Sequence, residues 1–243
     1  MASTSEVGHA KNVANFQDLI EFVIGYGETY NPSKNSLKLP QLIALRETAQ
    51  TKLNDVIAKN TIYNNKVNER MVAFGNLKSF STRLVNALQT TDATNETINN
   101  AKTFNRKMQG KKASTTQAST DPNAPAPATI STSQQSYDQL IQHLTGLKSV
   151  LETEPSYTPN EIELQIATID SKIADLSAKN TAVATAYTNI SNSRISRNET
   201  LYTNENGIYE TASEVKKYIK SVFGASSPQY NQVSGIKFNK PRL

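Results

Sequence analysis

Apolar side chains recur every three or four residues over much of the chain, which is the spacing of one face of an α-helix. Two early stretches show it, through Phe16, Leu19, Val23, Tyr26 and Tyr30 and through Tyr137, Leu140, Leu144, Leu147 and Leu151. Ser136 and Gln139 have the spacing of a capping box, and Asn15 is a residue type that favours an N-cap. We therefore predict one helix from each cap, ended by Pro32 and by Pro155.

The longest apolar pattern lies in the second half of the chain. It steps by four and three residues without a break through Ile162, Ile166, Ile169, Ile173, Leu176, Asn180, Val183, Tyr187 and Ile190. The preceding segment 158–161, Thr-Pro-Asn-Glu, combines a capping hydroxyl, a proline at the first helical position and a glutamate two residues later. Since no proline or glycine interrupts residues 160–205, we predict one long helix with coiled-coil-like heptad packing. A matching helix begins at Pro40, where Arg46 and Arg70 interrupt the apolar seam.

Asn60 and Asn180 occupy the same position in the two seams. A buried asparagine at such a position fixes the register and the orientation of the partner helix at some cost in stability. We therefore predict that both residues set register. Ligand binding by this amide pair and simple exposure to solvent are the alternatives.

Each long pattern is followed by a shorter helical one. The apolar positions are Leu77, Phe80, Leu84 and Leu88 in the first half, and Ile208, Ala212, Val215, Ile219 and Val222 in the second. Gly224 follows as a C-cap residue. Beyond it, the apolar residues Tyr230, Val233, Ile236 and Phe238 predict an extended tail that folds back and caps the bundle.

Short matches in the same order suggest that the chain is a tandem duplication. Residues 58–61 and 178–181 both read Ala-Lys-Asn-Thr, an offset of 120, and residues 15–20 match 136–141 at an offset of 121. The predicted organisation is a flexible N-terminus over 1–13, helical copy one over 14–107, a Pro/Ser/Thr/Ala-rich linker over 108–135, and copy two over 136–243 with its extended tail. The predicted fold is all-α: two tandem three-helix units that form an elongated bundle.

The composition fits long helices with narrow apolar stripes. Apolar residues make up 37% and charged residues 19%, and serine, threonine and asparagine account for much of the remainder. The absence of cysteine excludes disulfides, thiolate metal sites and a cysteine nucleophile. Two histidines, His9 and His143, cannot form a multi-histidine metal site alone, and we expect His143 at the surface. With no run of 18 apolar residues and no signal-peptide pattern, we expect a cytoplasmic protein, and leaderless export stays open.

No pattern in the sequence predicts catalysis. The paired carboxylates, such as Glu161 with Glu163 and Asp170 with Asp175, do not share a helix face toward the seam, so we predict no catalytic, cofactor-binding or metal-binding residues. The net charge is +5, and basic residues cluster at Arg106, Lys107, Lys111, Lys112, Lys216, Lys217, Lys220, Lys237, Lys240 and Arg242. Such clusters would suit phosphate groups, but they lie at termini with few aromatic residues between them, so we interpret them as ordinary solvated helix ends.

The closing segments 157–161, 193–202, 215–224 and 227–230 resemble a group of uncharacterised helical proteins of Bacteroidetes-type bacteria. The resemblance covers residues 136–240 and implies a helical fold, and it carries no functional residue to this chain. We therefore predict a non-enzymatic structural or protein-interaction bundle whose partner is another protein or a second copy, without a small-molecule ligand. A leaderless, membrane-active helical protein and a nucleic-acid or anion binder are the alternatives.

Overall fold

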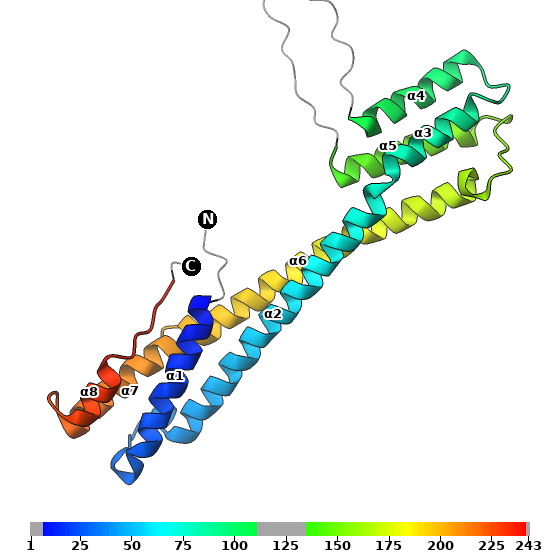
Figure 1. Ribbon diagram of the computed structural model, residues 1–243. Coiled ribbons are helices and arrows are strands. Elements are labelled where there is room, and N and C mark those ends of the chain that lie inside the picture. The colour runs from blue at the N-terminus through cyan, green and yellow to red at the C-terminus, as the bar shows by residue number, and fades with distance from the viewer. Residues whose placement is uncertain (1–6, 111–134, 242–243) are drawn as a thin grey trace, which may run out of the picture. The chain divides into compact units, whose positions relative to one another are not determined.

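The computed structural model describes residues 7–110 and 135–241 of the chain (Figure 1). In these ranges the chain is helical and contains no strand, which confirms the all-α prediction. The helices are α1 (Val7–Gly25), α2 (Leu39–Gly75), α3 (Leu77–Leu88), α4 (Asn95–Gln109), α5 (Tyr137–Glu152), α6 (Ile166–Tyr202), α7 (Ile208–Phe223) and α8 (Pro228–Ser234). Short 3-10 turns η1 (Gly27–Thr29), η2 (Asn35–Leu37) and η3 (Ile162–Leu164) precede the two long helices.

The helices form two compact units that cut across the two sequence copies. Unit 1 takes the described residues up to Tyr63 and those from Ala186 onward, and unit 2 runs from Asn64 to Thr185. Both boundaries fall inside the long helices α2 and α6. Each unit therefore combines part of copy one with part of copy two, instead of one copy forming one three-helix unit.

The helices α2 and α6 lie side by side and antiparallel in unit 1. Asp55 contacts Ser193 over 2.5 Å, and the rings of Tyr63 and Tyr187 are 5.9 Å apart. The buried seam positions are Leu42, Ala49, Leu53 and Val56 in this part of α2, and Ile169, Leu176, Val183 and Ile190 in α6. The other predicted seam positions are less covered: Ile166, Ile173 and Asn180 are half-buried, and Tyr187 is exposed.

The long helix α6 begins later than its capping pattern predicts. Ile162 lies in η3 and is 75% exposed, so the helical seam starts at Ile166. The later start of the helix has a local explanation: two backbone carbonyls before Ile166 accept hydrogen bonds from side-chain hydroxyls. The Leu164 carbonyl accepts from the Tyr157 hydroxyl, and the Ile162 carbonyl accepts from the Thr168 hydroxyl.

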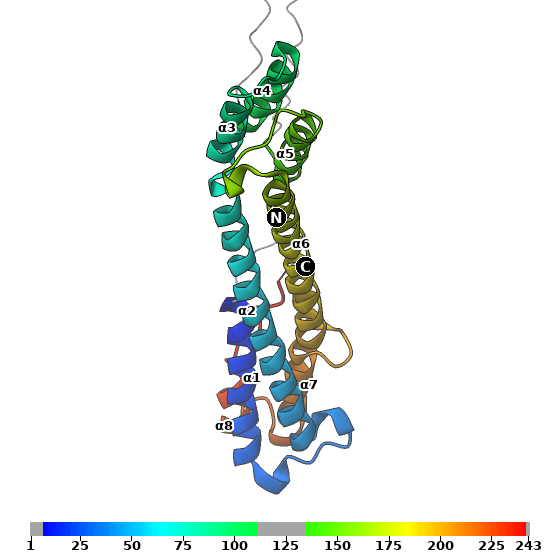
Figure 2. The same cartoon turned by 90° about the vertical axis from the view of Figure 1, so that its right-hand side faces the viewer.

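The core of unit 1 lies among α1, the first part of α2, the last part of α6, and α7. Its fully buried large side chains include Phe16, Leu19, Ile20 and Leu42. Figures 1 and 2 show α1 alongside α7, with α8 against both helices. Asn15 lies inside α1, because this helix begins at Val7, so the predicted N-cap at Asn15 is wrong.

The core of unit 2 lies where α3, α4 and α5 pack together with the ends of the long helices. The predicted N-cap Ser136 is confirmed, because its hydroxyl accepts a hydrogen bond from the Gln139 amide. Helix α4, which the apolar pattern does not predict, has Thr94 as its N-cap and Gly110, whose φ is 76°, as its C-cap. Its apolar content is confined to a few positions such as Ala101 and Met108, both fully buried.

Equivalent local structures recur in the two units at a constant spacing, which we call the structural offset. Tyr30 donates to the Leu37 carbonyl over 2.8 Å, and Tyr157 donates to the Leu164 carbonyl over 2.8 Å. The turns η2 and η3 are related by the same spacing, and so are α2 and α6, each 37 residues long. The structural offset is therefore one heptad longer than the offset of 120 read from the four-residue match.

Candidate functional site: a groove that holds the C-terminal tail

Residues 235–241 follow α8 as a tail without regular secondary structure, and it lies along α1 and α7 in unit 1. The Asn12 side chain binds both backbone groups of Asn239. Its amide nitrogen donates to the carbonyl over 2.7 Å, and its oxygen accepts from the N–H over 3.0 Å. Asn15 donates to the Lys237 carbonyl over 2.6 Å. Side chains of α1 thus hydrogen-bond the tail's main chain.

Lys216 of α7 approaches the tail from the other side. Its ammonium group donates to the Ile236 carbonyl and lies 5.3 Å from the centre of the Phe238 ring. Phe238 also makes an edge contact with the fully buried Phe16 of α1, at 6.5 Å between ring centres. Burial lowers the pKa of Lys216, which fits an ammonium group partly covered by the tail.

We use the name tail groove for the set of side chains that contact the tail, namely Asn12, Asn15 and Phe16 of α1 and Lys216 of α7. It combines one apolar contact for an aromatic side chain with polar side chains that bind backbone groups. Main-chain hydrogen bonds combined with pockets for selected side chains are the means by which proteins recognise extended peptides. The contacts of the tail groove with the chain's own tail are of this kind, and they include no nucleophile paired with a base.

A buried polar cluster adjoins the tail groove at Asn12. His9 Nδ1 is 2.7 Å from the Tyr202 hydroxyl, and Asn12 also donates to this hydroxyl over 3.1 Å. All three side chains are at least nine-tenths buried. Because Asn12 bonds both Tyr202 and Asn239, the cluster fixes the amide that recognises the tail. The sequence patterns single out none of these three residues, since hydrogen-bonding groups leave no periodic signal.

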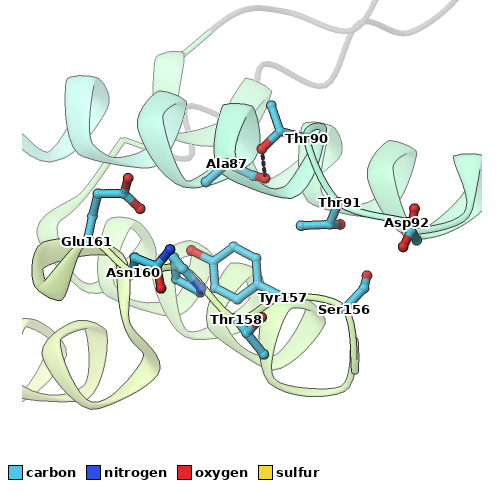
Figure 3. A pocket seen from close by; sticks show the side chains of 10 residues that line it. Ala87, Thr90, Thr91, Asp92, Ser156, Tyr157, Thr158, Asn160 and Glu161 are labelled. Atoms are coloured by element: carbon cyan, nitrogen blue, oxygen red, sulfur yellow. Dashed lines mark hydrogen bonds between the residues drawn. The ribbon is translucent and has the colours of Figure 1, made fainter.

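Unit 2 contains a polar hollow of about 520 Å³ between the loop after α3 and the loop before η3 (Figure 3). Its hydroxyls are largely engaged by the protein itself: Thr90 donates to Ala87 and Tyr157 to Leu164, each over 2.8 Å. The carboxylates of Asp92 and Glu161 also line it, and its lining contains no histidine, lysine or arginine. These groups stabilise the two loops, and the hollow lacks the paired groups of an acid–base or nucleophilic site.

Asn180, one of the two predicted register residues, lies at a polar junction of three helices in unit 2. Its oxygen accepts from Arg70 of α2 over 2.9 Å, and its nitrogen donates to Asp138 of α5 over 2.7 Å. Arg70 also lies 4.0 Å from the centre of the Tyr137 ring. The structure thus gives a role to the arginine that interrupts the apolar seam. Asn60 is half-buried in α2, in unit 1.

His143 is buried, which corrects the expectation that it lies at the surface. At the structural offset, its position in α5 corresponds to that of Phe16 in α1, and this position faces the core. Burial lowers the pKa of His143, and the charge of Lys107 lowers it further. The sequence alignment at an offset of 121 pairs His143 with Phe22 instead, and this pairing is the source of the error.

Most of the described residues of the basic clusters make contacts within their own unit. Lys220 lies 5.5 Å from the ring of Tyr230, and Lys240 donates to Asn204 over 2.9 Å. In unit 2, Lys107 faces the Phe104 ring at 5.7 Å, and the Arg106 guanidinium donates to a threonine hydroxyl. Lys217 is exposed on α7, and Lys237 is exposed in the tail. Lys111, Lys112 and Arg242 lie outside the described residues.

Within residues 7–110 and 135–241, no helix is long and apolar enough to span a bilayer. The same ranges contain no group of three or more His, Cys, Asp and Glu side chains placed to hold a metal ion. Comparison with known proteins finds no matching family model, no matching curated sequence and no matching solved structure. Function is therefore inferred from the contacts of the tail groove.

Proposed function

We propose that the protein is a non-enzymatic interaction protein that binds an extended peptide segment in the tail groove. The observation that supports this most directly is the recognition of the tail's main chain by Asn12, Asn15 and Lys216, with Phe238 packed on Phe16. Three successive residues, 236–238, each provide a carbonyl or a side chain to the groove. A segment that presents an aromatic side chain on an extended backbone is the partner that these contacts favour, because the bonds from Asn12 reach only backbone groups of the next residue.

Exposed apolar side chains add further surface for protein contacts. In unit 1, Ile57 is 59% exposed on α2 and Tyr187 is 59% exposed on α6. Single apolar residues at a surface are ordinary, so the tail groove, where the contacts are specific, is the principal site. The helix faces are secondary surfaces in this proposal.

The peptide itself provides the test. The full chain carrying Phe238→Ala would be mixed with a fluorescent peptide that has the sequence of residues 234–241, and anisotropy would be measured. We expect saturable binding, because the substitution removes the ring that anchors the chain's own tail. Full burial of a phenylalanine contributes about 1.5–3 kcal/mol, and Phe238 is half-buried. A peptide with alanine in place of the phenylalanine should therefore bind roughly 3- to 10-fold more weakly.

A second chain, Asn12→Ala with Phe238→Ala, controls for the groove. It should bind the peptide more weakly, because Asn12 makes two of the main-chain hydrogen bonds. Circular dichroism would check that both chains retain their helix content. Equal binding of both peptides to both chains would refute recognition by the tail groove.

We infer further that the chain is an internal duplication whose copies are related by the structural offset. The recurring tyrosine–leucine hydrogen bonds, the two 3-10 turns and the two helices of equal length support this inference. The two copies differ in the elements that pack beside their first helices, α1 and α5. Helix α4 packs against α5 in unit 2, whereas α8 and the tail pack against α1 in unit 1.

A further inference from the structure

We propose that the tail of one copy docks in the tail groove of a second copy, so that exchange of C-terminal tails links copies of this chain. This inference rests on the peptide-binding function proposed for the groove. The partner segment is residues 235–241 of another copy. A segment exchanged between identical chains makes the same contacts in the dimer as in the monomer, and exchange is therefore a low-cost route to association.

The tail is suited to exchange because its described contacts come from outside itself. Its carbonyls at Ile236, Lys237 and Asn239 accept from Lys216, Asn15 and Asn12, in that order along the chain. The tail has no regular secondary structure, and Gly235 separates it from α8. Release of the tail would break its contacts to α1 and α7, the Lys240 bond to Asn204 and the bond from the Ile236 N–H to the Val233 carbonyl at the end of α8, without interrupting α1 or α7.

The tail buries less apolar surface against α1 than α4 buries against α5 in unit 2. In unit 2, the 15-residue helix α4 packs against α5 and buries Ala101 and Met108 completely. In unit 1, the seven-residue helix α8 and the tail lie beside α1, and Ile236 and Phe238 are only half-buried. Fewer buried apolar side chains hold the tail, so less free energy opposes its release.

Concentration decides between docking in one chain and docking between chains. A tail connected to its own groove experiences an effective concentration of the order of millimolar, so internal docking dominates in dilute solution. Exchange should increase as the protein concentration approaches that range. Reciprocal exchange between two copies fills both grooves and produces a closed dimer.

The absence of cysteine from the sequence permits a direct cross-linking experiment. Asn15 lies beside Lys237 in the docked tail, with 2.6 Å between the amide nitrogen and the carbonyl oxygen. One full chain would carry Asn15→Cys, and another, with a different tag, Lys237→Cys. A short bis-maleimide would then be added to the concentrated mixture. We expect a cross-linked heterodimer that increases with concentration and decreases when the tail donor also carries Phe238→Ala.

Two controls make each outcome decisive. A single chain with both cysteines should cross-link internally in dilute solution, which shows that the pair is in reach and that the variants fold. A partner with Lys102→Cys, at an exposed position of α4, gives the level of random cross-linking. Exchange is refuted if the double-cysteine chain reacts internally while the mixed pair cross-links no more than the Lys102→Cys control. The peptide assay would still decide separately whether the groove binds peptides.

Discussion

The hydroxyl of Tyr157 donates a 2.8 Å hydrogen bond to the backbone carbonyl of Leu164, and both residues are buried. The bond spans the loop before α6 and holds η3 against the core of unit 2. In unit 1, Tyr30 and Leu37 make the same bond before α2. In both units, therefore, one tyrosine fixes the segment that leads into a 37-residue helix.

Substitution of this tyrosine should destabilise the protein without a large change in packing. Tyr157→Phe removes the hydroxyl and leaves the Leu164 carbonyl buried without its donor, which costs about 1–3 kcal/mol. Urea unfolding monitored by circular dichroism would measure the loss. Tyr30→Phe should lose a similar amount, whereas Tyr187→Phe, at an exposed position, should change little. A stability of Tyr157→Phe equal to that of the parent chain would show that the hydrogen bond contributes nothing.

The same two hydroxyls predict sensitivity to alkaline pH. Burial, followed by the charge of Glu161, raises the pKa of Tyr157 to about 12, and burial also raises the pKa of Tyr30. An unfolded tyrosine loses its proton near pH 10, so between pH 10 and 12 the unfolded state binds fewer protons than the folded state. Stability should therefore be complete below pH 10 and fall as the pH rises toward 12. Unfolding curves across this range should show a shallower fall for Tyr157→Phe than for the parent chain.

A close contact between α4 and α5 predicts a third effect. A Cβ atom added at Gly146 would lie 2.3 Å from Cε1 of Phe104, closer than two carbon atoms can approach. Gly146→Ala should therefore force the Phe104 ring to move and cost roughly 1–3 kcal/mol. Gly25→Ala is the matched control, because a Cβ atom there meets nothing within 4 Å. Thermal unfolding of both variants tests the contact, and equal melting temperatures would contradict it.

The helical class could be predicted from the sequence because apolar spacing records which face of a helix is buried. The seven-residue spacing of buried residues from Ile169 to Ile190 is visible in the pattern. The assignment of helices to units could not be predicted in this way, because the pattern does not record which face packs against which partner. The offset of 120 rests on a short match at residues 58–61, and so short a match can be displaced by a heptad while the apolar seam still aligns. Asn60 and Asn180 are not equivalent at the structural offset, where Leu53 corresponds to Asn180. That each asparagine sets register stays a prediction.

The tail groove shows a different limit of sequence reasoning. The apolar residues Ile236 and Phe238 indicate that the tail folds back, and the contacts of Phe238 with Phe16 and Lys216 agree with this part of the prediction. Tyr230 and Val233, predicted as part of the same extended segment, lie in the helix α8 instead. The residues that bind its main chain, Asn12 and Asn15, are polar positions in a chain rich in asparagine. Their role depends on backbone groups of a segment near the opposite end of the chain, and no local pattern carries that information.

The junction at Asn180 should show a measurable coupling energy. Arg70 donates to Asn180 and also lies on the Tyr137 ring, so removal of either partner affects a shared contact. Arg70→Met, Asn180→Leu and the double variant form a double-mutant cycle, and we expect a coupling of roughly 0.5–1.5 kcal/mol. Leucine is chosen because Leu53 stands at the corresponding position of α2 at the structural offset. Strictly additive losses of stability would indicate that the two side chains act independently.

His143 should make the stability of unit 2 sensitive to acid. Its pKa is lowered, first by burial and then by the charge of Lys107, so the folded state binds a proton less readily than the unfolded chain. Stability should therefore be complete above about pH 6.5, the usual value for histidine. It should decrease as the pH falls below that value, by at most about 1.4 kcal/mol per pH unit for one proton.

The substitution His143→Phe isolates this effect, because phenylalanine occupies the corresponding position in unit 1 as the fully buried Phe16. We expect the variant to match or exceed the stability of the parent chain at pH 8, and to lose less between pH 6.5 and pH 5. Urea unfolding at each pH gives the comparison, and the carboxylates contribute the same background to both chains. Parallel curves for the two proteins would mean that His143 takes up its proton equally in the folded and unfolded states.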